Sequence, residues 1–240
     1  KVHAALGYVA EKMVVIPNGY DLEVFRPDTA ARESIHKELQ IPKGTPVIGL
    51  VARFHPQKDH LNFIRAAGLL HQDRPDVYFV LCGHGLDWEN RELVTWIEEA
   101  GIRSRCHLLG LRDDIPKLTA AFDIASLSSF AEAFPNVVSE AMSCEVPCVV
   151  TDVVDAAYIV GDTGFVVPPK NPAALAGAWR KMLDLGQEGR SHMGMAARQR
   201  IKEQFDLPQV VGRYQDLFED LAGKNRGGTL SQEVVTHVRH

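Results

Sequence analysis

The sequence lacks the signatures of a metalloprotein, a disulfide-rich secreted domain, a membrane protein or a nucleic-acid-binding protein. Its four cysteines form no C-x-x-C pair, and its ten histidines include no H-E-x-x-H spacing, so no metal site is indicated. The formal net charge is −5, whereas nucleic-acid-binding domains are usually basic. No apolar run approaches the ~20 residues that span a membrane. We therefore expect no metal, no nucleic-acid partner and no transmembrane segment.

Cysteine usage and the start of the chain bear on where the protein is found. Cys82, Cys106 and Cys148 lie in or beside apolar runs, with Cys144 close by, which predicts buried free thiols in a reducing compartment. No signal peptide is visible, and the chain opens at Lys1 without an initiator Met, so we interpret it as a segment of a longer protein. We expect a cytoplasmic protein, and for its parent a peripheral position at the inner face of the membrane.

From residue 46 onward, apolar runs alternate with helical patterns. An amphipathic stretch with Leu61, Ile64, Ala67 and Leu70 on one face predicts a helix after the first run. Continuous apolar runs predict strands buried on both faces at 47–51, 77–82, 106–109, 123–127, 146–150 and 164–167. Further helices are predicted at 88–100, 113–122 and 135–143. The alternation predicts an α/β fold, a Rossmann-like parallel sheet with helices on both faces, which binds its ligand at the carboxyl edge.

The two ends of the chain have different patterns. Residues 12–17 predict a short strand before a turn at Asn18-Gly19. Helices are predicted at 29–39, 172–185, 190–205 and 207–221, followed by a loose linker at 222–229 and a tail at 230–240.

Two glutamates, Glu132 and Glu140, lie just before and within the helix predicted at 135–143. Carboxylates only accept hydrogen bonds, so they suit the hydroxyls of a ribose or hexose. Between them, backbone amides of Phe134 to Val137 lie at a helix N-terminus, where unpaired N–H groups favour an anion such as phosphate. The alternative is an ordinary capped helix with Glu132 as a favourable first-turn charge.

Two cations, Arg53 and Lys58, occupy the polar loop after the first sheet strand. Together they suit a diphosphate, although solvated loop charges are the alternative. The Gly83-His84-Gly85 turn lacks the complete G-x-G-x-x-G fingerprint, so a nicotinamide cofactor is not indicated. We interpret its glycines as permitting a tight turn close to a ligand.

Short motifs follow one another along residues 14–205. They are Ile16-Pro17-Asn18-Gly19-Tyr20-Asp21, Val51-Ala52-Arg53 with Lys58, Gly110 after its strand, the E-x7-E segment, and Thr151-Asp152 leading to residues 163–168. As a set they resemble the group 1 glycosyltransferases, a retaining family with the GT-B fold. The resemblance implies two Rossmann-like domains facing across a cleft, of which this chain is similar to the C-terminal one. It implies an interdomain segment (1–28), a nucleotide-sugar-binding domain (29–205), and a C-terminal helix and tail (206–240) that crosses to the missing N-terminal domain.

The resemblance also implies roles for the candidate residues. Arg53 and Lys58 would bind the diphosphate and stabilise the leaving group, with Glu132 at the donor sugar. Glu140 would bond the ribose hydroxyls. The distal phosphate and sugar would meet Phe134, Pro135, Asn136 and Val137, and the nucleobase would meet Gly110, Leu111 and Arg112. The donor would be a UDP-sugar or GDP-sugar, used without a metal or other cofactor. The acceptor would be a glycan or lipid-linked sugar in cell-envelope polysaccharide or glycolipid synthesis.

The sequence departs from the family at three places. Ala133 replaces the glycine that usually follows the first glutamate. Glu145 replaces the glycine usual before the proline of the fifth strand region, and Val154-Asp155 replaces a Gly-Gly pair. An additional carboxylate near a diphosphate would weaken its binding unless it points away. These departures keep open a second hypothesis, a non-catalytic nucleotide-sugar or phosphosugar binding module. A dehydrogenase-type domain is disfavoured by the incomplete glycine fingerprint.

Overall fold

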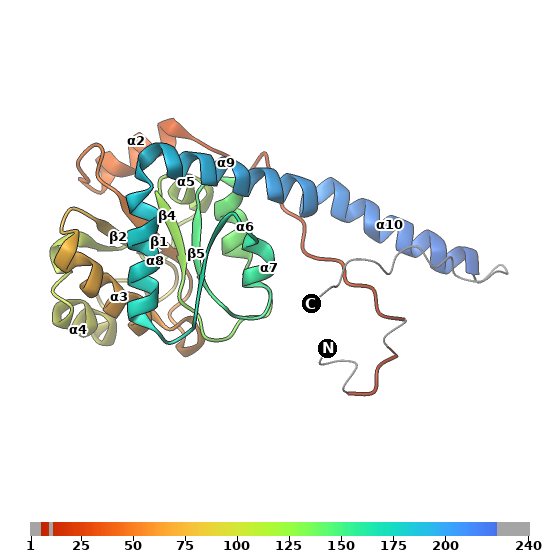
Figure 1. Ribbon diagram of the computed structural model, residues 1–240, viewed down its shortest axis with the longest axis horizontal. Helices are drawn as coiled ribbons and strands as arrows, with labels where there is room; N and C mark the ends of the chain where they lie inside the picture. The colour runs from red at the N-terminus through yellow and green to blue at the C-terminus, as the bar shows by residue number, and fades with distance from the viewer. Residues whose placement is uncertain (1–5, 10–11, 225–240) are drawn as a thin grey trace. The chain divides into compact units, whose positions relative to one another are not determined.

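The structure is a computed structural model that describes residues 6–9 and 12–224. Within these residues the centre is a six-stranded sheet of parallel neighbours in the order β3-β2-β1-β4-β5-β6 (Figure 1). The strands are β1 (Val47–Val51), β2 (Tyr78–Cys82), β3 (Cys106–Leu108), β4 (Ile124–Leu127), β5 (Cys148–Thr151) and β6 (Gly164–Val167). The predicted Rossmann-like sheet is confirmed. Its strand order reverses between β1 and β4, and this switch point is where such sheets bind ligands.

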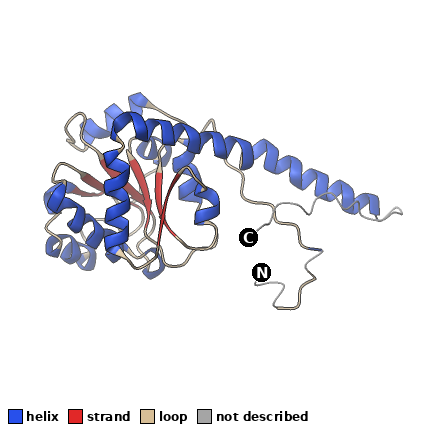
Figure 2. Ribbon diagram, viewed as in Figure 1, coloured by secondary structure: helices blue, strands red, loops and turns tan. Residues whose placement is uncertain are grey.

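Helices cover both faces of the sheet (Figure 2). Helix α3 packs against α4 and α8, whereas α6 packs against α5, α7 and α9. The helices and 3₁₀ turns up to residue 204 are α2 (Thr29–Glu38), η2 (Pro56–Lys58), α3 (His60–Asp73), α4 (Arg91–Glu99), η3 (Arg103–Arg105), α5 (Ile115–Ala120), α6 (Asn136–Ser143), α7 (Ala156–Val160), α8 (Pro172–Asp184) and α9 (Gly186–Gln204). The predicted helices at 88–100 and 113–122 are thus shorter than expected.

The core forms because the strand side chains are apolar on both sides of the sheet. Trp179 of α8 lies edge-on to Phe63 of α3, with the ring centroids 5.0 Å apart, and both side chains are fully buried. The Trp179 indole N–H donates to the hydroxyl of Ser126 in β4 over 3.2 Å, so its polar atom is satisfied. Helix α8 is thereby fixed against the sheet.

The strand predicted at residues 12–17 is wrong. These residues are irregular, apart from a single 3₁₀ position at Lys12. Val14 and Val15 are 50% and 85% exposed. A short apolar run becomes a strand only where another strand supplies backbone partners, and no described strand pairs with this one.

Residues Tyr20–Gln204 form one compact unit, and the described residues up to Gly19 group with those from Phe205 in a second. In the second unit Gly19 lies against the start of α10 (Leu207–Lys224), since a Cβ there would be 2.9 Å from the Leu207 Cα. The linker predicted from residue 222 is wrong for its first three residues, because α10 continues through Lys224. The rest of the linker and the predicted tail lie outside the described residues.

One face of α10 is apolar and exposed. Its side chains recur at alternating steps of four and three residues, the spacing of a helix that packs against a partner. They are Leu207, Val211, Tyr214, Phe218 and Leu221, between 40% and 63% exposed. No helix among the described residues is long and apolar enough to cross a membrane.

Candidate functional site

The loops that follow β1, β2 and β3 are joined by backbone hydrogen bonds beyond the strand ends. The Phe54 amide donates to the His84 carbonyl over 2.7 Å, and the Gly83 amide donates to the Gly110 carbonyl over 2.8 Å. Because the carboxyl ends of parallel strands share one edge of the sheet, these bonds extend that edge. They place the loops of Arg53, His84 and Gly110 next to one another.

Gly83 is required at this edge by the close approach of two backbones. Its φ is +144°, and a Cβ there would lie 1.9 Å from the carbonyl oxygen of Ala52. No side chain fits in that space. The first glycine of the Gly83-His84-Gly85 turn therefore permits the loops after β1 and β2 to pack together.

Lys58 and Glu132, which were predicted to act at the same edge, form an ion pair. The Lys58 Nζ lies 2.5 Å from the Glu132 Oε1, and the side chains are 22% and 10% exposed. The hydroxyl of Ser129 donates to the same oxygen over 2.6 Å. The structure therefore brings together one predicted phosphate ligand and one predicted sugar ligand.

Two further hydrogen bonds fix the loops that carry this ion pair. The hydroxyl of Ser128 donates to the Lys58 carbonyl over 2.7 Å. The amide of Phe130 donates to the Gln57 carbonyl over 2.9 Å. The position of the Lys58 side chain is therefore set from the loop after β4 as well as from its own 3₁₀ turn.

Arg53 is not part of this ion pair. Its residue is exposed, and its guanidinium forms no ion pair within the described part of the chain. A guanidinium at the rim of the site has all of its donors available to a phosphate.

The segment from Phe134 to Val137 leads into α6, which begins at Asn136. Pro135 stands at the N-cap, the helix has no side-chain cap, and its first turn contains no acidic residue. The alternative of Glu132 as a first-turn charge is therefore wrong, because this residue lies before the helix and pairs with Lys58. The hydroxyl of Tyr20 donates to the Asn136 Oδ1 over 2.8 Å, so this oxygen has a partner outside the helix.

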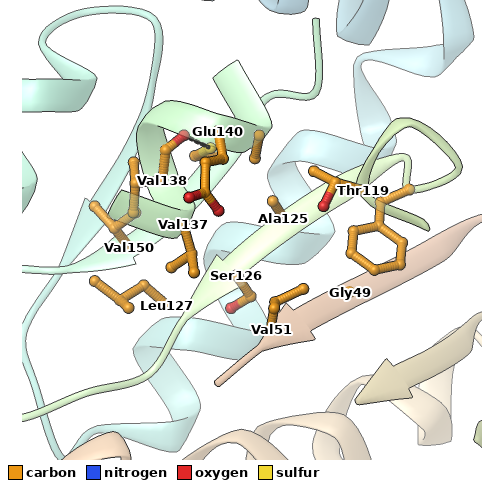
Figure 3. A pocket seen from close by; sticks show the side chains of 13 residues that line it. Gly49, Val51, Thr119, Ala125, Ser126, Leu127, Val137, Val138, Glu140 and Val150 are labelled. Atoms are coloured by element: carbon orange, nitrogen blue, oxygen red, sulfur yellow. Dashed lines mark hydrogen bonds between the residues drawn. The ribbon is translucent and has the colours of Figure 1, made fainter. Parts of the chain in front are cut away.

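Glu140 reaches from α6 into a pocket beside the switch point between β1 and β4. Figure 3 shows its carboxylate directed toward β4, among apolar side chains that include Val137 and Val138. The pocket also contacts Val51 of β1 and Val137 of α6. Burial raises the pKa of Glu140, and its carboxylate has no hydrogen-bond partner among the described residues. A half-buried acceptor without a donor is what a ligand hydroxyl would satisfy.

The sequence matches the family described as "Glycosyl transferases group 1" over residues 31–200. The chain belongs to the group 1 glycosyl transferases. It is 29% identical over 214 residues to the UDP-Gal:alpha-D-GlcNAc-diphosphoundecaprenol alpha-1,3-galactosyltransferase of Escherichia coli, covering 88% of this chain and 54% of that protein. The chain thus spans about half the length of the curated relatives it matches.

Solved glycosyltransferase structures share its fold. The structure of Anabaena HepE in complex with UDP-glucose is 27% identical, with a TM-score of 0.78 over 92% of this chain and 60% of that one. A C-terminal domain of a group 1 glycosyl transferase from Francisella tularensis matches over its whole length and 79% of this chain, with 24% identity and a TM-score of 0.66.

In this group 1 glycosyl transferase chain, the loop after β3 presents backbone and one apolar side chain. Gly110 has a φ of +60°, and Leu111 is 74% exposed. The Arg112 guanidinium is held by Asp114 at 2.7 Å and by Glu38 at 2.5 Å. These carboxylates raise the pKa of Arg112, which stays charged and engaged within the protein.

Two of the three departures from the family's glycines keep a glycine-like backbone. Glu145 and Val154 have φ values of 59° and 43°, whereas Ala133 is not among the residues with positive φ. Positive φ is strained for a β-branched residue such as Val154. The loops therefore keep a left-handed shape at positions 145 and 154 without the residue that adopts it at least cost.

The four cysteines are buried free thiols, as predicted. Burial raises the pKa of Cys82 to about 11 and that of Cys106 to about 12, so they remain protonated. Within the described ranges no group of three His, Cys, Asp or Glu side chains is placed to hold a metal ion.

Ser129 is not among the residues that the sequence predicts to act at the site. Its signal was the three-residue spacing to Glu132 within one loop, which lets a hydroxyl reach the carboxylate. Serine is common in loops, so this spacing alone does not single it out.

Proposed function

We propose that this chain is the donor-binding half of a retaining glycosyltransferase that transfers a sugar from a nucleoside-diphosphate sugar. The observation that carries the proposal is the grouping of complementary charges on one sheet edge. Lys58 of the loop after β1 pairs with Glu132, the exposed Arg53 lies in the same loop, and Glu140 occupies the neighbouring switch-point pocket. A diphosphate binds cations and backbone amides, whereas the hydroxyls of a sugar or ribose bind carboxylates. This edge of the sheet contains both kinds of group.

The diphosphate is assigned to Arg53, Lys58 and the N-terminus of α6. Arg53 has donors available, and α6 begins without a side-chain cap or an acidic first turn. Cations and helix amides stabilise the charge that develops on the diphosphate as it leaves. They would perform this task without a metal ion.

The two glutamates are assigned to different hydroxyls of the donor. Glu140, without a donor of its own and beside the switch point, suits the ribose diol. Glu132, in the loop that precedes α6, suits the sugar. The loop of Gly110, Leu111 and Arg112 would then meet the base through backbone and Leu111, since the Arg112 guanidinium is engaged elsewhere.

The remaining parts of the proposal rest on the family resemblance. The Escherichia coli relative is named for a UDP-Gal donor, and HepE was solved with UDP-glucose, which supports a UDP-hexose here. The acceptor, a glycan or lipid-linked sugar, would bind a partner domain. The exposed apolar face of α10 is the surface we assign to that domain.

The hypothesis of a non-catalytic binding module depended on the departures from the family's glycines. The left-handed backbone at Glu145 and Val154 weakens that support, because both positions have the positive φ that a glycine would adopt. The experiment that separates the two is calorimetry with UDP, GDP, ADP and NAD, followed by a transfer assay of the full-length parent with the UDP-sugar or GDP-sugar. Nucleoside diphosphate binding with transfer supports the enzyme, whereas binding without transfer by the parent would favour the module.

A further inference from the structure

In the Lys58–Glu132 ion pair, a carboxylate binds the cation that the proposed function assigns to the diphosphate of the donor. The proposed function assigns Lys58 to the diphosphate, yet its ammonium lies 2.5 Å from the Glu132 Oε1. An ammonium has three donors, but a diphosphate beside this carboxylate would bring like charges together. Glu132 and a diphosphate are therefore rivals for Lys58.

The hydrogen bonds of Glu132 show what would remain after Lys58 changed partner. Both Lys58 and Ser129 donate to Oε1, whereas Oε2 has no donor among the described residues. Because the side chain is only 10% exposed, water has little access to replace the lost ammonium. Ser129 would stay as one donor, and a hydroxyl of the donor sugar would supply the next.

We propose that Glu132 competes with the diphosphate for Lys58. When the donor binds, Lys58 leaves Glu132 and pairs with the diphosphate. Ser129 is the positioning residue that holds Glu132 through this exchange. The inference rests on the proposed donor site. The exchange makes the Lys58–Glu132 ion pair affect how tightly substrate and product bind. The sugar donor satisfies Glu132 with a hydroxyl, whereas the nucleoside diphosphate left after transfer does not. The exchange therefore favours the donor over its own product.

The first test measures UDP and uridine binding by calorimetry. Glu132→Gln keeps the shape of the side chain but removes its charge, so UDP should bind about three- to tenfold more tightly, the scale of the net contribution of one ordinary hydrogen bond. Uridine, which has no phosphate, should bind unchanged. In a Lys58→Met background the same Glu132→Gln change should give no gain. Glu98→Gln is the matched control, because it removes one negative charge from a surface pair with Arg103, and it should leave UDP binding unchanged.

The second test examines Ser129. Ser129→Ala should weaken UDP binding about threefold, because the released carboxylate loses its last donor. The loss should disappear in the Glu132→Gln background and be reversed by Ser129→Thr. Ser143→Ala is the matched control, since Ser143 is a buried serine whose hydroxyl bonds the Ser139 carbonyl in α6.

The outcomes are distinct. A gain in UDP affinity on Glu132→Gln that requires Lys58 supports the exchange. Unchanged or weaker UDP binding on Glu132→Gln, or an equal gain without Lys58, overturns it while leaving the donor site in place. A loss on Ser129→Ala that persists in the Glu132→Gln background removes Ser129 from the proposal. No binding of UDP, GDP or ADP by the wild-type chain or any variant would instead remove the proposed function itself.

Discussion

Gly194 of α9 lies directly against the carbonyl oxygen of Glu145, because a Cβ at position 194 would be only 1.9 Å from that atom. Glu145 follows the C-terminal end of α6, and the Arg198 guanidinium, one turn further along α9, donates to the carbonyl of Ser143 in α6. A cation at that end also complements the helix dipole. Helix α9 therefore fixes the helix that carries Glu140.

Gly194→Ala is expected to destabilise the chain by about 1–3 kcal/mol or more, because the methyl group would overlap a backbone atom that cannot rotate away. The free energy of unfolding from urea titration measures this. Gly177→Ala in α8 is the control, since a Cβ there meets nothing within 4 Å. It should stabilise by about 0.5–1 kcal/mol through helix propensity. Equal effects at the two positions would contradict the packing described here.

Val154→Gly is expected to stabilise the chain, although glycine usually does the opposite. Val154 has a φ of 43°, and relieving about 1–2 kcal/mol of left-handed strain should outweigh the added entropy of the unfolded chain, so we expect a net gain of about 0.5–1 kcal/mol. Val24, also an exposed valine but without positive φ, is the control, and Val24→Gly should destabilise. A loss of stability in both variants would mean that position 154 is not strained.

Arg53→Ala is expected to weaken UDP binding by roughly 1.5–3 kcal/mol, the scale of hydrogen bonds to a charged group. Uridine should bind the variant as it binds the wild type, because only the phosphates contact a guanidinium at the rim. Calorimetry with the two ligands measures the difference. Equal losses for UDP and uridine would show that Arg53 acts on the fold or on the base instead.

Glu140 should make stability depend on pH with a defined sign. Burial raises its pKa above the ordinary 4.5, so the stability that it contributes is present below that value and is lost as the pH rises through the folded-state pKa. Glu140→Gln removes this loss. Its melting temperature relative to wild type should therefore rise between about pH 4 and pH 7. A difference that stays constant with pH would contradict the burial of an unpaired carboxylate.

The same residue should distinguish the ribose from the phosphates. Glu140→Ala should weaken uridine and UDP by similar factors, because both contain the ribose. The measurement is calorimetry on the same two ligands used for Arg53→Ala, with the opposite pattern expected. Loss of UDP binding alone would move Glu140 from the ribose to the phosphates.

Residues 1–240 are expected to bind a nucleoside diphosphate without efficient sugar transfer. Transfer needs an acceptor hydroxyl held about 3 Å from the anomeric carbon in a site that excludes water. The proposed donor site would supply only one wall of such a site. Binding and transfer assays on this chain measure both properties, and efficient transfer would place the acceptor site on these residues.

The sequence by itself determined the architecture of the sheet. Each strand between residues 47 and 167 was found at or beside an apolar run, because strands buried on both faces must be apolar throughout. The order of strands and helices then placed Arg53, Lys58 and Glu132 at the carboxyl edge. The apolar run at residues 12–17 is not a strand, because a strand also needs a neighbouring strand to pair with, and the local sequence does not show whether one is there.

Only the tertiary structure decided which of these residues meet. Lys58 and Glu132 are separated by 74 positions. Sequence spacing does not indicate which of the two cations in the loop after β1, Arg53 or Lys58, contacts Glu132. The hydrogen bonds of Ser128 and Phe130 to that loop direct Lys58, and not Arg53, to the carboxylate. Likewise, the left-handed backbone at Glu145 and Val154 is imposed by the surrounding fold, against the preference of both residues. Residue type determines which interactions each residue can form, whereas packing between distant loops determines which of them it does form.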